Sequence, residues 1–229
     1  MGHSITRISR ARLGVGALAV VATAVAALVV GTAPASARAS VAGAAFNGSA
    51  SYTKAGVQVT VAPLAPCSVA GPISATTPGI SVNGAKFGSG SSSCTTTVVD
   101  PNTSTTQTKS HSENSQFELS ALVLLGGDRV RINNYKVDCV ADEDGTTASW
   151  SIASTSGLGT LPRPVPQNYV RELDNLIGTP LATITFNEIS FPGGEDGSIA
   201  LTLAHVRFLP ASGMSGEILV GNTACAPTP

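Results

Sequence analysis

The chain has 229 residues with 13 Lys or Arg against 14 Asp or Glu, a formal net charge of −1. Without the N-terminal segment discussed next, three arginines are lost and the balance becomes 10 basic against 14 acidic residues, near −4. This argues against nucleic acids and anionic lipid surfaces as partners, since both attract basic proteins. Charged residues are only 12% of the chain, whereas Ser, Thr, Gly, Ala and Val abound, which favours strands over helices.

The first 37 residues are predicted to be a Sec signal peptide that is cut before Arg38. Three arginines precede the apolar run 13–30, and Ala35-Ser36-Ala37 supplies the small residues of a cleavage site. The rival interpretation is an uncleaved N-terminal helix that tethers the protein to a membrane. No later apolar run is long enough to cross a bilayer, so no membrane span is expected in the mature chain, 38–229.

Four cysteines follow this segment, and an even count in an exported chain predicts two disulfides. Of the three pairings, we favour Cys67–Cys94, which closes a Gly/Ser/Pro-rich excursion, and Cys139–Cys225, which ties the C-terminal tail to a mid-chain strand. Loop closures of these lengths contribute about 3.5 and 4.5 kcal/mol. A metal site is not expected, because the chain has no C-x-x-C pair and the mature part has only two histidines.

Alternation of apolar and polar residues predicts strands along most of the mature chain. The first is 56–61, followed by a loop-rich excursion over 66–116. Within that excursion we expect short strands near 80–82 and 95–99, and a polar stretch, 103–116, that forms an exposed hairpin or an extended edge. A meander follows; its three strands are 117–124, 129–139 and 149–152.

The C-terminal third is predicted to hold one short helix among further strands. The helix is placed at about 166–177, because Tyr169, Leu173, Leu176 and Ile177 recur at helical spacing and Gly178 can end it. Further strands are expected at 181–189, 199–209 and 217–220. The fold class is therefore all-β: an antiparallel β-sandwich or open barrel with at most one helix, in a single disulfide-stapled domain over 38–229.

The segment Leu209-Pro210-Ala211-Ser212-Gly213 differs by one residue from the sortase signal Leu-Pro-x-Thr-Gly. A working signal is followed by an apolar span and a basic stop, and neither follows here. Turn-forming residues occupy 210–216 between two alternating stretches. The segment is therefore interpreted as a hairpin loop, and no C-terminal anchor is expected.

Candidate chemical groups are few. The acidic stretches Asp142–Gly145 and Glu195–Gly197 do not have the spacing of a calcium loop and are interpreted as solvated turns. His205 lies on an alternating strand on the same side as Arg207, whereas His111 lies in a polar stretch. The motifs G-x-S-x-G and H-E-x-x-H are not found, and no S-x-x-K arrangement is convincing. No catalytic, metal or cofactor-binding residue is assigned, and no cofactor is expected.

Several segments from Phe117 onward are similar to the choice-of-anchor P family, exported actinobacterial all-β proteins of unassigned activity. They are 119–125, the strand of Cys139, Thr185-Phe186-Asn187-Glu188, Leu203-Ala204-His205-Val206, and 216–221 before Cys225. Where that family has an "LNEQ"-like tetrapeptide, this chain has Phe186-Asn187-Glu188-Ile189. The resemblance implies a secreted or surface location and some interchange of C-terminal anchors among relatives; it implies no catalytic residues.

Three hypotheses of function follow. The first is a secreted or envelope-associated, non-catalytic β-domain with a binding or structural role toward an unknown extracellular or envelope partner. The second is an exported hydrolase that uses a Ser/His/acid set around His205, which requires a serine and a carboxylate within hydrogen-bond reach of the imidazole. The third is a lipid or small-ligand carrier, which requires an apolar cavity between the sheets.

Overall fold

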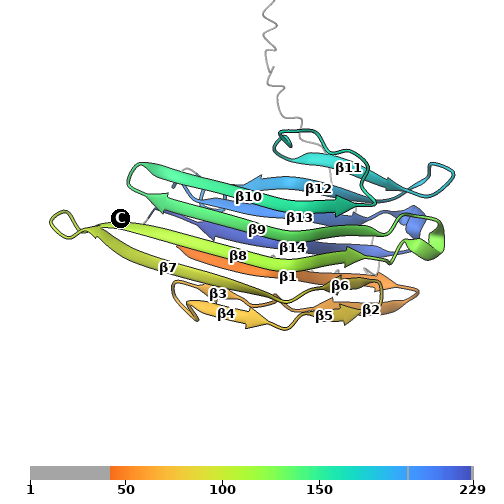
Figure 1. Cartoon of the computed structure of the whole chain (residues 1–229), viewed down its shortest axis with the longest axis horizontal. Helices are drawn as coiled ribbons and strands as arrows, with labels where there is room; N and C mark the ends of the chain where they lie inside the picture. Colours follow the sequence, from red (N-terminus) through yellow and green to blue (C-terminus); the bar gives the residue numbers. More distant parts are fainter. Residues whose placement is uncertain (1–41, 195, 228–229) are drawn as a thin grey trace, which may run out of the picture. The chain divides into compact units, whose positions relative to one another are not determined.

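Residues 42–194 and 196–227 are described by a computed structural model, and they form fourteen strands and two short 3-10 helices (Figure 1). They belong to one compact unit, Arg38–Pro229. The expected signal peptide and its cut before Arg38 lie outside the described residues. The elements are β1 (Gly43–Lys54), β2 (Val57–Val61), β3 (Cys67–Ser68), β4 (Ser74–Thr77), β5 (Ile80–Val82), β6 (Ala85–Phe87), β7 (Gly90–Asp100), β8 (Thr105–Leu119), η1 (Val123–Leu125), β9 (Val130–Asp142), β10 (Gly145–Ser156), β11 (Tyr169–Asp174), β12 (Pro180–Ser190), β13 (Ile199–Phe208), η2 (Pro210–Ser212) and β14 (Ser215–Cys225).

The strands pair in two antiparallel sheets that face each other. Sheet A has the order β11-β12-β13-β14-β1-β2, with β3 also paired to β1. Sheet B has the order β10-β9-β8-β6-β5; β7 pairs with β8 beyond the end of β6, and β4 pairs with β7. Strand β1 lies against β7 and β8, β14 against β8 and β9, and β13 against β9 and β10.

The all-β prediction is confirmed, and the sheets are not closed into a barrel, so the fold is a sandwich. The expected meander is formed by β8, β9 and β10. Leu209–Gly213 connects β13 to β14 through η2, as the turn interpretation predicts. The segment 66–116 contains more strand than expected, since it holds β3 to β7 and most of β8. Its side chains are mostly small and polar, so their alternation was not visible as an apolar pattern.

The prediction of a helix over 166–177 is wrong. Tyr169–Asp174 forms β11, which pairs with β12, and the described residues contain no α-helix. Of the supposed apolar helix face, only Leu173 is fully buried, whereas Leu176 and Ile177 lie exposed in the turn after β11. A short helix is marginal without packing along a whole face. The free edge of β12, in contrast, offers β11 a complete set of backbone partners.

A row of irregular positions crosses both sheets at the same level. We call it the kink row; it consists of Asn47, Gly221, Leu203 and Asn187 in sheet A and of Ser115, Asn134 and Ala153 in sheet B. The strand pairing is interrupted at these residues and resumes in the same register beyond them. Asn134, Asn187 and Gly221 have positive φ angles of 47°, 53° and 60°, a conformation that Asn and Gly tolerate better than other residues.

The kink row shifts which residues face the interior. Inward side chains are two residues apart on either side of the row but three apart across it. In β9, for example, the step is from Ile132 to Tyr135; in β8 it is from Phe117 to Asn114. The row divides the interior into an apolar half and a polar half. The apolar half contains Tyr52, Phe87, Phe117, Leu119, Ile132, Phe186, Val206 and Ile218. The polar half contains Asn47, Ser92, Thr108, Ser110, Ser112, Asn114 and Thr223, together with the apolar side chains Tyr135, Val137 and Leu201.

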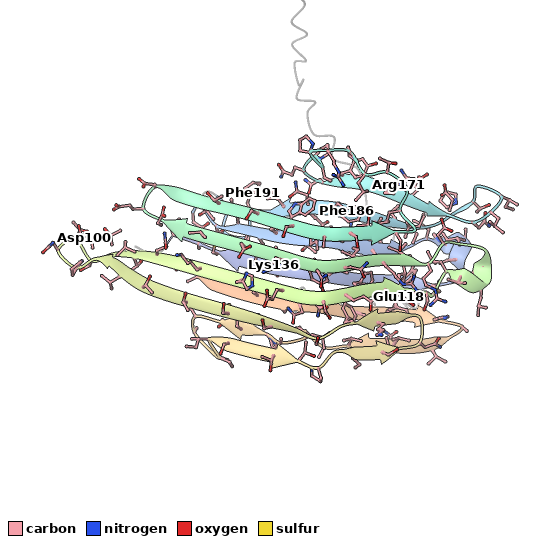
Figure 2. All side chains as sticks on the ribbon, viewed as in Figure 1. Asp100, Glu118, Lys136, Arg171, Phe186 and Phe191 are labelled. Carbon is pink, nitrogen blue, oxygen red and sulfur yellow. A yellow bond between two sulfur atoms is a disulfide. The ribbon has the colours of Figure 1, made fainter. Side chains whose placement is uncertain are left out.

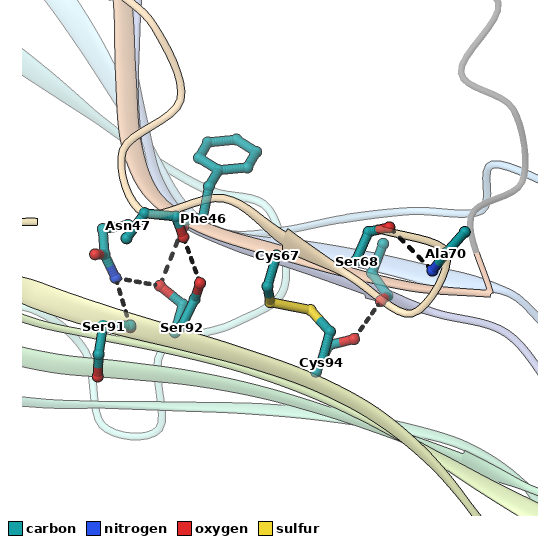
Figure 3. Close-up of a disulfide and its surroundings, with 12 residues drawn as sticks. Phe46, Asn47, Cys67, Ser68, Ala70, Ser91, Ser92 and Cys94 are labelled. Carbon is teal, nitrogen blue, oxygen red and sulfur yellow. Dashed lines mark hydrogen bonds between the residues drawn. A yellow bond between two sulfur atoms is a disulfide. The ribbon is translucent and has the colours of Figure 1, made fainter. Parts of the chain in front are cut away.

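Both disulfides lie in the polar half, and each joins the two sheets. Cys67 of β3 pairs with Cys94 of β7, and Cys139 of β9 pairs with Cys225 of β14, which are the pairings favoured from the sequence. Figure 3 shows the first of them beside Asn47. The disulfides therefore fasten the part of the interior that has the fewest large apolar side chains.

Hydrogen bonds from side chain to backbone also connect the sheets in the polar half. The amide of Asn47 lies 2.9 Å from the Ser91 carbonyl oxygen and 2.8 Å from that of Glu113, both in sheet B. Ser110 donates to the carbonyl of Ala224 at 2.9 Å, and Ser112 donates to that of Phe46 at 3.1 Å. Such pairing offsets the cost of burying polar groups, although Oδ1 of Asn47 and Oγ1 of Thr223 are buried without a partner. Within the described part of the chain, no helix has the length and hydropathy needed to cross a membrane.

Candidate functional site

His205, the candidate of the hydrolase hypothesis, lies on the outer face of sheet A between two glutamates. Its Nδ1 is 2.6 Å from Oε2 of Glu188, and its Nε2 is 2.8 Å from Oε2 of Glu217. Arg207 donates to the other oxygen of Glu188 at 2.8 Å, so it shares a side with His205 as expected. Three of the five segments that carry the family resemblance thus lie on adjacent strands, β12, β13 and β14, and meet in this network.

This arrangement leaves the imidazole without a free nitrogen. Each ring nitrogen lies within hydrogen-bond distance of a carboxylate oxygen, so neither faces a nucleophile, and among the described residues no serine is hydrogen-bonded to the ring. The hydrogen bond from His205, and then that from Arg207, lowers the pKa of Glu188 to about 2 despite opposing desolvation. The network is suited to holding three strands together.

His111 lies on the opposite outer face, in β8, and is also flanked by acids. Its Nδ1 is 2.7 Å from Oδ1 of Asp138, and its Nε2 is 3.7 Å from Glu113, which also pairs with Lys136 at 3.2 Å. Figure 2 shows Lys136 on this face. His111 is therefore a half-exposed member of a surface charge network, rather than the fully solvated side chain expected from the sequence.

The acidic stretches form turns. Asp142 accepts from the backbone N–H of Asp144 at 3.1 Å and from Gln107 at 3.2 Å. Asp196 accepts from the backbone N–H of Ser198 at 2.8 Å, while Glu195 lies outside the described residues. Within the described ranges, no group of three or more His, Cys, Asp or Glu side chains is arranged to hold a metal ion. The interpretation of these stretches as turns agrees with this geometry.

A groove of about 870 Å³ runs along β10, the edge strand of sheet B. We call it the β10 groove. Its far wall is the segment 159–165, which returns from the end of β10 toward β11. The floor is apolar and rests on the main core through Trp150, Ile152, Leu161 and Val165. Polar groups line the rest of the groove, and they are Ser149, Ser154, Thr155, Thr160, Arg163 and Asn187.

The position of the groove follows from the unequal width of the two sheets. Sheet B ends at β10, which lies over β13, whereas sheet A continues past β13 through β12 and β11 (Figure 1). Asn187 of β12 lines the groove from sheet A. The groove therefore occupies the place of the next strand of sheet B.

The backbone of β10 is open on this side. Within the described residues, its backbone hydrogen bonds are those of the β9 ladder. One edge of a twelve-residue strand thus presents unpaired N–H and C=O groups beside an apolar floor. Such an edge is a template for another strand.

Sequence reasoning identified only part of this site. The strand around Trp150 was predicted, but the segment 157–168 was expected to lead into a helix, so the two walls were not brought together. The site could have been suspected from Gly145–Ser156, because this stretch around the predicted strand contains no charged residue that would protect an edge. Comparison with family models, curated proteins and solved structures finds no match. The function must therefore be argued from this geometry.

Proposed function

We propose that this protein is an exported, non-catalytic binding module of the cell envelope or its surroundings, with the β10 groove as its binding site. The two disulfides are compatible with a location outside the reducing cytosol. The signal peptide over 1–37 and membership of the choice-of-anchor P family stay predictions. The observation that carries the proposal is the unpaired edge of β10 beside an apolar floor.

The occupant that fits this site is an extended polypeptide segment that adds a strand to sheet B. Its backbone pairs with β10, and this pairing supplies affinity. Because side chains alternate along a strand, every second one points toward Trp150 and Ile152, and the others point to solvent. The apolar floor therefore selects segments in which apolar residues alternate with polar ones.

The other sheet edges support this choice by contrast. Natural proteins protect edges with charges, prolines or short strands. In the described chain, β11 at the edge of sheet A has six residues, three of them charged, and β2, β3, β4 and β5 have two to five residues each. Strand β10 has twelve residues and no charge. Strand β7 is also uncovered beyond its four pairs with β4, but that stretch is shorter and ends at Asp100. Strand β10 is therefore the longest of these edges, and unlike β7 and β11 it carries no charge.

The test uses Trp150, the single tryptophan of the chain, as a fluorescent reporter. The probe is a synthetic hexapeptide of alternating Val and Thr with blocked ends, titrated into the disulfide-intact protein. Saturable change in Trp150 emission is expected. A second peptide with the same side chains but with alternate backbone nitrogens methylated should bind at least about tenfold more weakly, because it cannot donate those hydrogen bonds.

A matched pair of lysine substitutions locates the site. Ala153 is exposed and lines the groove, whereas Ser151 is exposed on the same strand but does not line it. Ala153→Lys should weaken peptide binding at least about tenfold, and Ser151→Lys should leave it within about twofold. Equal binding of the methylated peptide, or equal loss in both lysine variants, would refute strand addition. If both peptides fail to bind the wild-type protein, the proposed function is wrong.

A further inference from the structure

Five exposed aliphatic side chains gather at one end of the molecule, on two loops. We call them the apolar tip: Val123, Leu124 and Leu125 in η1, and Leu176 and Ile177 in the β11–β12 turn. Leu124, Leu176 and Ile177 are 88%, 92% and 87% exposed. Figure 1 shows both loops at the same end of the sheets. Isolated exposed aliphatic residues are ordinary, but a contiguous group marks a surface that contacts something.

The two loops are held together by the backbone. Gly127 and Asn175 form an isolated antiparallel bridge, and a Cβ at Gly126 would lie 3.7 Å from Cγ of Leu176. The side chain of Asn175 accepts from the N–H groups of Ile177 and Thr179 at 3.1 and 2.9 Å. The fold thus presents the apolar tip in a fixed shape, at the cost of leaving these side chains in water.

The size and shape of the tip distinguish between partners. The five exposures together equal about three and a half fully exposed side chains, or about 350 Å² of apolar surface. A stable protein interface needs about 800 Å² on each partner and is usually anchored by Trp, Tyr or Arg. The tip is smaller than this, and all its members are aliphatic. Fluid hydrocarbon accepts such a protruding group without a matching cavity.

The charges around the tip indicate which lipid surface it suits. Asp128 follows η1 and Asp174 precedes the turn, while Arg129 and Arg131 both pair with Glu118, at 2.6 and 2.8 Å. Basic clusters are what recruit proteins to anionic lipids, and these balanced charges do not form one. This agrees with the net negative charge of the mature sequence, which argues against anionic surfaces.

We propose that the apolar tip inserts reversibly into the interfacial region of a lipid bilayer with an uncharged or zwitterionic surface. Insertion to about 5–10 Å buries aliphatic side chains of this length without any membrane span. The proposal goes beyond peptide binding in the β10 groove and is independent of it. An exported binding module with such a tip would be held at a bilayer while its groove stays accessible.

The test measures sedimentation of the disulfide-intact protein with vesicles of phosphatidylcholine. Binding is expected, with less than about twofold change between 0.05 and 0.5 M salt, because it depends on apolar burial rather than on charge. Vesicles that contain phosphatidylglycerol should bind no more tightly. The triple variant Leu124→Ser/Leu176→Ser/Ile177→Ser should lose at least about tenfold in vesicle affinity, with an unchanged unfolding midpoint, since all three side chains are exposed.

The matched control is Val98→Ser/Val99→Ser, which removes two exposed aliphatic side chains from β7, outside the tip. It should bind vesicles within about twofold of wild type. Absence of wild-type binding, or equal losses in the triple variant and the control, would overturn the proposal. Light scattering tests whether the tip instead contacts a second copy of the chain. If the wild type forms a dimer and does not bind vesicles, and the triple variant is a monomer, the tip is a dimer contact. Peptide binding in the groove should persist in the triple variant, so the two proposals fail separately.

Discussion

The two halves of this sandwich have the same strands and register but different interiors. On one side of the kink row, the sheets meet through large side chains such as Phe117, Leu119 and Ile132, all fully buried. On the other side, Tyr135, Val137 and Leu201 are buried as well, but the rest of the contact is made by Ser, Thr, Asn and small residues. The comparison shows that one pair of sheets can be joined in two ways, by apolar volume or by specific bonds.

The magnitudes explain why the polar half needs its disulfides. Burying one large apolar side chain contributes about 1.5–3 kcal/mol, whereas a typical buried hydrogen bond contributes about 1 kcal/mol net. The contact of the two sheets therefore contributes less stabilising free energy in the half that contains Ser110, Ser112 and Asn47. The two disulfides supply about 3.5 and 4.5 kcal/mol by loop closure, and both lie in this half.

The largest effect is expected from removing the disulfide that closes the longer loop. Cys139→Ala/Cys225→Ala opens a closure with a sequence separation of 86, and Cys67→Ala/Cys94→Ala opens one of 27. The free energy of unfolding should fall by about 4.5 kcal/mol in the first variant and by about 3.5 kcal/mol in the second. Urea unfolding followed by tryptophan fluorescence measures both. A loss below about 1 kcal/mol in both would show that hydrogen bonds alone hold the polar half.

A pair of substitutions, one in each half, compares how the two halves are held together. Asn47→Leu keeps the number and branching of the side-chain heavy atoms but leaves the carbonyls of Ser91 and Glu113 without their donor. We expect a loss of about 3 kcal/mol in unfolding free energy, because unpaired buried acceptors cost about 1–3 kcal/mol each.

Leu119→Met is the counterpart in the apolar half. Leu119 is fully buried, and a swap that conserves apolar volume costs less than about 1.5 kcal/mol. Chemical denaturation of both variants measures the contrast. Equal losses would mean that the polar half, like the apolar half, depends on volume alone, and the division proposed here would be wrong.

The same division explains what the sequence could predict. In the apolar half, alternation revealed the strands around Phe117, Ile132 and Ile184. In the polar half, the inward residues of β1 and β8 are Gly, Ala, Ser, Thr and Asn, so they do not stand out as apolar. The cysteine spacing compensated there, since it led to the observed pairings.

The kink row and the groove could not be derived from periodicity. A shift from spacing two to spacing three breaks an alternating pattern in the middle of each strand. Its local signals are Asn47, Asn134, Asn187 and Gly221, residue types that strands disfavour. The groove depends on sheet A being wider than sheet B, which is a property of the strand order. The His205 network likewise required β12, β13 and β14 to be neighbours.

The smallest effect concerns this network, which spans the boundary between the halves. Glu188 directly follows the kink-row residue Asn187 and binds both His205 and Arg207. Its pKa is near 2 in the folded protein and near 4.5 when unfolded, so the ionised carboxylate stabilises the fold at higher pH. The gain is fully present above about pH 5 and is lost as the pH falls from 4.5 toward 2.

Glu188→Gln should therefore lower the unfolding free energy by about 1–2 kcal/mol at pH 7. This is less than the full pKa shift would give, because solvent screens the charges on this outer face. At pH 2 the deficit should shrink to a small remainder, because the wild-type carboxylate is then about half protonated in the folded protein and almost fully protonated in the unfolded one. Glu172→Gln is the control, since Glu172 is exposed on β11 and should follow the wild type at both pH values. If the loss of unfolding free energy in Glu188→Gln stays constant from pH 7 to pH 2, Glu188 acts through packing rather than charge. The ion pairs of Glu188 with His205 and Arg207 would then not stabilise the boundary between the halves.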